Sequence, residues 1–298
     1  MNNNPMRKDG IFALMLTPFN EDRTIDYKAY EAYCEWQVKQ GAHGMFASCG
    51  SSEMAMLTQK ERLTLASIAV KHKGNIPVVA TGNLEPSWDA QVEEVKRMSD
   101  TGVDGLVFVT KGYGNDEERF YSYITDLCKH TKLPIFLYEF PGYPNNKISG
   151  KVYNKLVKTG RIFGIKDTTC TVEGIKDKID NKGDSVIHQA NMPFLLESFK
   201  LGADGVMATP TTCGTAFFIR FWNAFKSGDM ALAEKRYHEI MLFDMAMDSG
   251  FCASAKELCN LQGAKMNWYT RGNHSLSKSR LKQLEAFHDW CKNNELME

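Results

Sequence analysis

The stretch TGVDGLVFV, residues 101–109, has two counterparts elsewhere in the chain, QGAHGMFA at residues 40–47 and LGADGVMAT at residues 201–209. In each stretch a helical pattern ends at a glycine, two residues follow, and a second glycine opens a short apolar run. The first glycine is expected just past a helix end, because glycine adopts the left-handed backbone conformation without steric cost. The apolar runs do not alternate with polar residues, which indicates strands that are covered on both faces.

The separations between these stretches fit a repeating strand–helix unit of about 30 residues. Helical patterns lie between the strand patterns, for example at 27–40, 58–73, 87–100 and 116–131. Eight alternating strands predict a (β/α)8 TIM barrel rather than an open doubly wound sheet, and no G-x-G-x-x-G motif follows the first strand. The expected strands are 11–16, 44–47, 76–82, 104–110, 134–140, 162–167, 185–190 and 204–210.

The strand patterns stop after residue 213, and residues 214–295 read as helices. One of these helices is expected to complete the barrel. We therefore expect residues 1–225 to form the barrel with the active site, and residues 226–298 to form a C-terminal helical appendage. Met and aromatic residues at helical spacing in this part indicate core or subunit contacts.

Composition excludes several classes of partner. The 298 residues carry 36 Lys and Arg against 36 Asp and Glu, so the net charge is zero, which gives no support to nucleic acid or an anionic membrane as a partner. The N-terminus has no signal-peptide pattern, and no run has the length of a membrane span. The eight cysteines form no C-x-x-C pair, which is typical of reduced thiols in a cytoplasmic protein. No His and Cys cluster has metal-ligand spacing, so neither a metal nor another cofactor is expected.

Lys166 stands in the apolar strand pattern IFGIKD, residues 162–167. One interpretation is a lysine at a strand end whose stem is buried and whose ammonium is in water. The other is a lysine whose pKa is lowered by burial, so that the free amine attacks a carbonyl and forms an imine. In a TIM barrel the carboxyl ends of the strands carry the catalytic groups, and Lys166 ends the sixth strand. Its position favours the second interpretation.

The fifth strand is expected to end in LYEFPGY, residues 137–143, which contains Tyr138. Tyr138 lies one strand from Lys166 and at the expected height of that residue. A tyrosine here either packs its ring and caps a loop carbonyl, or moves protons for an imine mechanism. The neighbouring lysine favours proton transfer.

The loop after the second strand contains CGSSE, residues 49–53. Ser51 and Ser52 offer hydroxyl groups, Gly50 allows a close backbone approach, and backbone N–H groups at a helix start suit a carboxylate. The alternative is that these serines only cap the helix. Together the lysine, the phenol and this loop predict a site for a small 2-keto acid.

At these residues the sequence resembles the dihydrodipicolinate synthase and N-acetylneuraminate lyase family of class I aldolases, from ALMLTPF through GIKDTT and GADGVMAT. The resemblance implies that Lys166 is the Schiff-base lysine, that Tyr138 is the catalytic tyrosine, and that CGSSE is the carboxylate-binding loop. It implies pyruvate as the imine partner and a homotetramer built as a dimer of dimers. Tyr113 falls near the position of an aromatic residue that one subunit of family members often contributes to the site of its dimer partner. Val206 is expected among the substrate-binding residues.

Several positions depart from the family pattern. Gly50 stands where the family has the first hydroxyl residue of the loop, which relays protons to the tyrosine, and Ser51 matches the second. Tyr143 stands where the true synthase has an arginine for the second substrate's carboxylate. Asn191 and Met192 stand where relatives place carboxylates. We expect Tyr143, Asn191 and Met192 to form a more apolar second-substrate pocket.

The leading hypothesis is a pyruvate-dependent Schiff-base lyase that makes or breaks a C–C bond to an aldehyde. That aldehyde either lacks a carboxylate, or has an anion bound by residues that the pattern does not identify. The alternatives are a true dihydrodipicolinate synthase, and an N-acetylneuraminate or 2-keto-3-deoxy sugar acid aldolase or dehydratase. A hypothesis from another class is a non-catalytic 2-keto acid binding protein.

Overall fold

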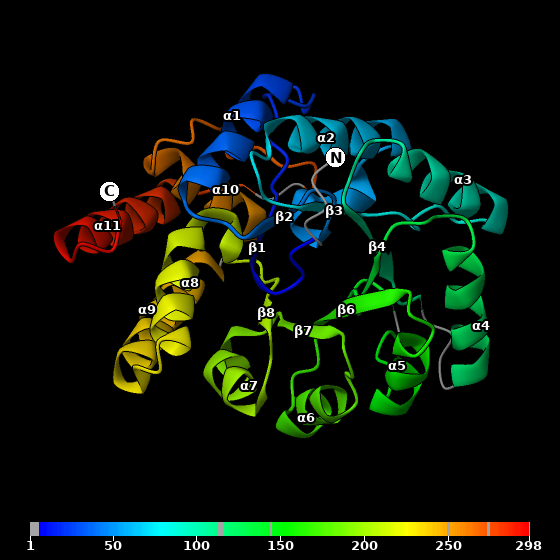
Figure 1. Cartoon of the computed structure of the whole chain (residues 1–298). Helices are drawn as coiled ribbons and strands as arrows, with labels where there is room; N and C mark the ends of the chain where they lie inside the picture. The colour runs from blue at the N-terminus through cyan, green and yellow to red at the C-terminus, as the bar shows by residue number, and fades with distance from the viewer. Residues whose placement is uncertain (1–5, 112–115, 144, 249–250, 273–274, 298) are drawn as a thin grey trace.

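Eight parallel strands close into a barrel in chain order, as a computed structural model of the protein shows (Figure 1). The structure describes the chain except residues 1–5, 112–115, 144, 249–250, 273–274 and 298. The predicted TIM barrel is therefore confirmed. The strands are β1 (Gly10–Leu14), β2 (Gly44–Phe46), β3 (Val78–Thr81), β4 (Gly105–Val109), β5 (Ile135–Tyr138), β6 (Ile162–Asp167), β7 (Val186–Gln189) and β8 (Gly205–Val206).

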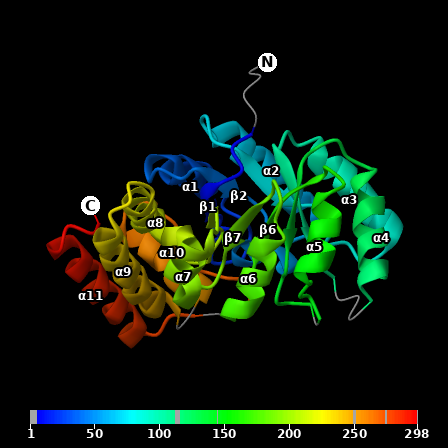
Figure 2. The ribbon, with the colours of Figure 1, turned by 60° about the horizontal axis from the view of Figure 1, so that its bottom comes forward.

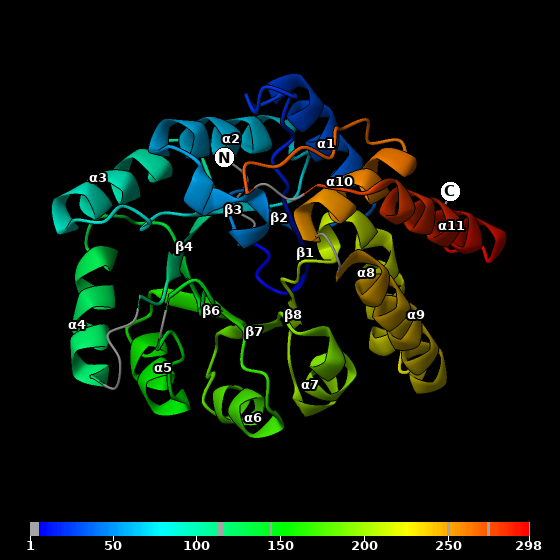
Figure 3. The ribbon, with the colours of Figure 1, turned by 180° about the vertical axis from the view of Figure 1, so that it is seen from behind.

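Helices surround the strands on the outside of the barrel (Figures 1 and 3). Each of the four helices given as examples above begins within one residue of its expected start. Short 3-10 turns occur at η1 (Gly50–Ser52), η2 (Met54–Met56) and η3 (Met192–Phe194). The helices are α1 (Tyr27–Lys39), α2 (Gln59–His72), α3 (Trp88–Ser99), α4 (Glu117–Cys128), α5 (Gly150–Val157), α6 (Val172–Asp180), α7 (Leu195–Leu201), α8 (Thr211–Lys226), α9 (Met230–Asp248), α10 (Phe251–Leu261) and α11 (Lys278–Asn293).

The repeated stretch forms the junctions that the pattern predicted. Gly41, Gly102 and Gly202 have φ angles of 85°, 86° and 110°, where a side chain would be strained. The polar residue before each second glycine accepts a hydrogen bond from a backbone N–H near the start of the preceding strand. These pairs are His43 with Ile11 at 3.1 Å, Asp104 with Val78 at 2.8 Å, and Asp204 with Ile187 at 2.9 Å. Each repeat therefore links neighbouring strands as well as ending a helix.

Buried side chains form two cores, because successive residues of a strand point to opposite faces. The inner core fills the barrel and consists of Phe12, Leu14, Phe46, Cys49, Met54, Val79, Val107, Val109, Phe136, Tyr138, Val186 and Met207. The outer core lies between strands and helices, and its strand residues include Ile11, Ala13, Met45, Val78, Leu106, Ile135, Leu137, Ile165 and Ile187. A side chain at the carboxyl end of a strand therefore faces the barrel mouth only if it belongs to the inner set.

The helices after the barrel gather at one side of the molecule (Figure 2). Phe243 of α9 packs against Phe217 of α8, with ring centroids 4.8 Å apart, and both belong to the outer core. The boundary expected at residue 225 stays a prediction, one residue before α8 ends. Among the described residues, no helix combines the length and the apolar character needed to cross a lipid bilayer.

Candidate active site

Lys166 and Tyr138 meet inside the barrel mouth. The register of β5 and β6 pairs Tyr138 with Lys166, so both residues lie at the same height on neighbouring strands. Each residue is only 4% exposed to solvent. The Lys166 Nζ lies 4.3 Å from the centroid of the Tyr138 ring. The strands thus bring a buried amine and a phenol together.

Lys166 differs from the other lysines that are buried in the described part of the chain. Lys178 lies 3.1 Å from a carboxylate oxygen of Glu139, and Lys256 lies 2.9 Å from one of Glu53. No carboxylate pairs with Lys166 among the described residues. Burial lowers the pKa of Lys166 to about 8, because no nearby carboxylate compensates for the lost hydration of the ammonium. The amine is therefore partly uncharged near neutral pH, as a nucleophile must be.

The Tyr138 phenol is enclosed by aromatic rings. Phe46 lies edge-on at 6.1 Å and Phe140 at 5.5 Å between ring centroids. Burial raises the pKa of Tyr138, with a further contribution from Cys49, so the phenol keeps its proton at neutral pH. A protonated phenol beside an amine can donate a proton to a bound substrate and accept one in turn.

Gly50 of η1 touches the same phenol. A Cβ atom built at Gly50 would lie 3.2 Å from the Tyr138 hydroxyl and 3.3 Å from the Phe140 ring. The position where the family has its first hydroxyl residue is thus closely packed here by these two rings. A Cβ atom at residue 50 would require the Tyr138 hydroxyl and the Phe140 ring to shift by a few tenths of an ångström, which favours glycine.

The two serines of the loop differ in their bonding. Ser52 accepts a hydrogen bond from the Cys49 N–H at 2.8 Å and donates one to the Cys49 carbonyl at 2.7 Å, so its hydroxyl caps the turn. Within the described part of the chain, the Ser51 hydroxyl makes a single long contact, of 3.5 Å, with the Thr209 hydroxyl. Ser51 is therefore better placed than Ser52 to bind a ligand through its side chain.

Glu53 anchors this loop to the C-terminal helices, which the sequence pattern did not predict. Its backbone has a left-handed φ of 58°, and its carboxylate pairs with Lys256 of α10 at 2.9 Å. The same carboxylate accepts hydrogen bonds from the N–H groups of Arg271 and Gly272 at 2.8 and 3.0 Å. The carbonyl of Ser51 also contacts the Cys252 thiol of α10. The helices beyond the barrel thus hold the loop in place.

A cavity of about 400 Å³ opens from Lys166 and Tyr138 toward the surface. Most residues of the cavity wall are not among the predicted site residues. Lys147, Thr168 and Cys170 nevertheless lie in the loops after β5 and β6, and these loops are at the end of the barrel where catalytic groups are expected. No three His, Cys, Asp or Glu side chains in the described ranges are grouped so that they could hold a metal ion. The cavity is lined by Tyr138, Pro141, Asn146, Lys147, Lys166, Thr168, Cys170, Ala190, Asn191 and Thr209.

The remaining predicted site residues are spread over different surroundings. Asn191 lines the cavity, and its amide donates to the Thr169 carbonyl at 3.0 Å. Tyr143 packs edge-on against Phe140 at 5.8 Å and is not among the cavity-lining residues. The structure does not bring Met192 and Val206 to the cavity, because both side chains are buried in the outer core. Tyr113 lies outside the described residues.

The barrel and the buried lysine at its mouth define the class of protein, a TIM barrel with a lysine-centred site. Residues 7–287 match the model of the dihydrodipicolinate synthetase family. The chain belongs to this family, whose members include lyases, and it is therefore classed as a lyase.

Individual relatives are distant in sequence but cover nearly the whole chain. The 4-hydroxy-tetrahydrodipicolinate synthase of Thermodesulfovibrio yellowstonii is 27% identical over 80% of this chain and 82% of its own length. The structure of YagE from E. coli K12 in complex with pyruvate is 22% identical, has a TM-score of 0.87, and covers 95% of this chain and 98% of its own. CdNal from Clostridium difficile, solved with mannosamine, is 18% identical with a TM-score of 0.87 over 96% and 99% of the two chains. These two structures show the shared fold.

The Glu53–Lys256 pair generates a stability prediction. Replacing Glu53 with Gln leaves the Lys256 ammonium buried without its counter-charge, so Glu53→Gln should lower the free energy of unfolding by about 3 kcal/mol. Removing both charges in Glu53→Gln/Lys256→Met should cost less than the single change. Urea denaturation of the three proteins measures both values. A double variant that is less stable than Glu53→Gln would contradict this account.

Proposed function

We propose that the protein forms an imine between Lys166 and pyruvate and uses it to make or break a C–C bond to an aldehyde. The observation that carries this proposal is the buried Lys166 amine, whose pKa is lowered to about 8 beside the Tyr138 ring. The structure of the related YagE in complex with pyruvate supports pyruvate as the keto acid.

The chemistry proceeds from the chain's own groups. The neutral amine of Lys166 adds to the pyruvate carbonyl carbon, and loss of water gives a protonated imine. This imine accepts the electron pair of a neighbouring C–H bond, so a methyl proton leaves and an enamine forms. The enamine carbon attacks the aldehyde carbon, and water then releases the product from Lys166. The reverse order of steps cleaves the same bond.

Tyr138 moves the protons of these steps in the proposal, since its protonated phenol lies beside the amine. Ser51 and the backbone N–H group of Gly50 hold the pyruvate carboxylate in this proposal, since the Ser52 N–H already donates to the Cys49 carbonyl at 3.2 Å. Because Gly50 carries no hydroxyl, the relay to Tyr138 differs from the family pattern, and Ser51 is the nearest hydroxyl of the loop that is not used as a cap. We also propose a cytoplasmic homotetramer.

Two alternatives within the family keep the same lysine. A true dihydrodipicolinate synthase is supported by the similarity to the Thermodesulfovibrio synthase, but Tyr143 replaces the expected arginine. A sugar-acid aldolase or dehydratase is the other alternative, and the likeness to CdNal is a likeness of fold. A non-catalytic 2-keto acid binding protein would keep the pocket without proton exchange.

Exchange of the pyruvate methyl protons into deuterated water tests the proposal. The rate should rise with pH around a midpoint of about 8, because only the uncharged amine of Lys166 adds to pyruvate. Lys166→Ala should abolish exchange above the uncatalysed rate, and Tyr138→Phe should slow it by about 10² to 10³. NMR of pyruvate measures all three rates.

The matched control is Tyr153→Phe, because Tyr153 is a buried phenol of the outer core that bonds to Ser185 away from the cavity. Its exchange rate should stay within about threefold of the wild type. Pyruvate binding without exchange would instead establish the non-catalytic alternative.

The cavity wall points to the class of aldehyde. Lys147 lines the cavity and is half exposed. Its ammonium donates to the carbonyl and the hydroxyl of Thr168, and it lies 3.9 Å from the buried Glu139 carboxylate on the side away from solvent. The described lining residues include no carboxylate. We propose that the aldehyde carries an acidic group that Lys147 binds, in place of the apolar pocket expected around Tyr143 and Met192.

A matched pair of aldehydes tests the role of Lys147. Lys147→Met should lower kcat/KM about 10- to 100-fold for succinic semialdehyde, because it removes a charge-assisted hydrogen bond. For butanal, which lacks the carboxylate, the change should stay below about threefold.

Condensation with pyruvate is followed by mass spectrometry, with the exposed Lys151→Met as the control variant. Glyceraldehyde 3-phosphate against glyceraldehyde separates phosphate from carboxylate. Equal losses for both members of each pair would rule out this role.

A further inference from the structure

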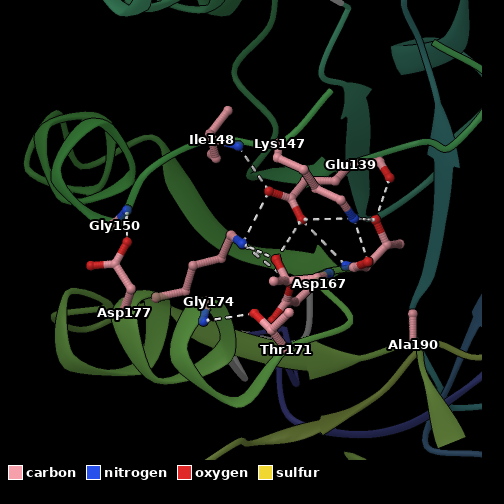
Figure 4. Close-up of polar contacts among 12 residues, drawn as sticks. Glu139, Lys147, Ile148, Gly150, Asp167, Thr171, Gly174, Asp177 and Ala190 are labelled. Carbon is pink, nitrogen blue, oxygen red and sulfur yellow. Dashed lines mark hydrogen bonds and ion pairs between the residues drawn. The ribbon is translucent and has the colours of Figure 1, made fainter. Parts of the chain in front are cut away.

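Behind the site, on the outer face of the sheet, lies a cluster of buried charges that the proposed reaction does not use. Glu139 directly follows Tyr138, and Asp167 directly follows Lys166. Both carboxylates are fully buried, and Lys178 of α6 is 2% exposed. Figure 4 shows the side chains of Glu139 and Asp167 pointing toward each other, with Lys147 on the side of Glu139 that faces away from Asp167. We call Glu139, Asp167 and Lys178 the buried triad.

Lys178 joins the ends of two neighbouring strands. Its Nζ lies 3.1 Å from Glu139 Oε1 at the end of β5 and 3.3 Å from Asp167 Oδ1 at the end of β6. It also donates to the Thr169 hydroxyl, in the segment that follows β6. Because the register pairs Tyr138 with Lys166, the residues that Lys178 links come immediately after the proposed catalytic pair on both strands.

Backbone groups hold both carboxylates rigidly. Glu139 Oε1 accepts from the Ile148 N–H at 2.9 Å and its Oε2 from the Thr168 N–H at 3.3 Å. Asp167 Oδ1 accepts from the Thr169 N–H at 2.7 Å. The two carboxylates are therefore tied to the loops after β5 and β6, and Lys178 ties those loops to each other.

The energetics favour a role in geometry over one in stability alone. Burial raises the pKa of Glu139, although the charge of Lys178 acts to lower it. Burial acts to lower the pKa of Lys178, but the carboxylates of Glu139 and Asp167 outweigh this effect and raise it. Burying these charges is costly, and an apolar cluster of the same volume is often as stable or more so. A charged triad does, however, fix the distance and direction between the groups that it joins.

We propose that Lys178 is a positioning residue, which fixes the ends of β5 and β6 so that the Tyr138 phenol stays against the Lys166 amine. Among the described residues, Lys178 does not line the cavity and pairs with Glu139 and Asp167, so it acts through these two carboxylates. This inference rests on the proposed function, since it assigns a role within the same site.

Pyruvate proton exchange by Lys178→Met tests the inference. The variant should lower kcat about 10- to 100-fold, because misplacement of a proton-transfer group by about 1 Å costs that much. The KM for pyruvate should stay within about threefold, since the carboxylate-binding loop is not touched. In a Tyr138→Phe background the same substitution should lower kcat by less than about threefold, because the group that it positions is already gone.

Two further variants keep the test decisive. Glu139→Gln keeps the side-chain shape while weakening the link to Lys178, and should give a smaller loss of about three- to tenfold with the same non-additivity. It carries the test if Lys178→Met does not fold. The control is Lys182→Met, which removes the 2.7 Å pair with Asp204 at the opposite end of the barrel and should leave kcat within about twofold.

The outcomes separate the two proposals. A folded Lys178→Met protein with wild-type kcat, or losses that add fully to those of Tyr138→Phe, would overturn the positioning role alone. A wild type that exchanges no pyruvate protons would overturn the proposed function, and this inference with it.

Discussion

The absence of a counter-ion at Lys166 is the constraint on which the rest of the site depends. Lys166 is buried in the barrel mouth beside an aromatic ring, and no carboxylate pairs with it among the described residues. An ammonium there loses its hydration without compensation, so its pKa falls to about 8. A carboxylate within ion-pairing distance of Lys166 would stabilise the ammonium form, and the amine would then be too rarely uncharged to act as a nucleophile.

Strand alternation separates the reactive amine from the acidic groups that lie next to it in the sequence. Lys166 and Tyr138 face the barrel interior, whereas Asp167 and Glu139, one residue further on, face α6 and pair with Lys178. A shift of one residue in either strand would exchange these sets and place a carboxylate inside the barrel mouth. The same alternation thus supplies a lysine of lowered pKa inside the barrel and a paired charge cluster outside it.

The sequence predicts the fold well because the fold rests on local signals that repeat. The glycine junctions at 41, 102 and 202 and the apolar runs after them define β2, β4 and β8, and the spacing between these three strands indicates the other five. The positions of Lys166 and Tyr138 follow, since both end strands of the same barrel. Parts of the site that depend on distant segments are not predictable in this way: Lys256 lies 203 residues from Glu53, and nothing local to either residue indicates the pair. Val206 and Met192 are expected at the site, whereas their side chains lie in the outer core, because side-chain direction in a short element depends on register.

Sodium borohydride reduction in the presence of pyruvate tests the central claim most directly. After digestion, mass spectrometry should find the reduced pyruvate adduct on the peptide that contains Lys166, with a yield that rises as the pH approaches and passes about 8. An unmodified Lys166 peptide after this treatment, or an adduct on another lysine instead, would contradict the account.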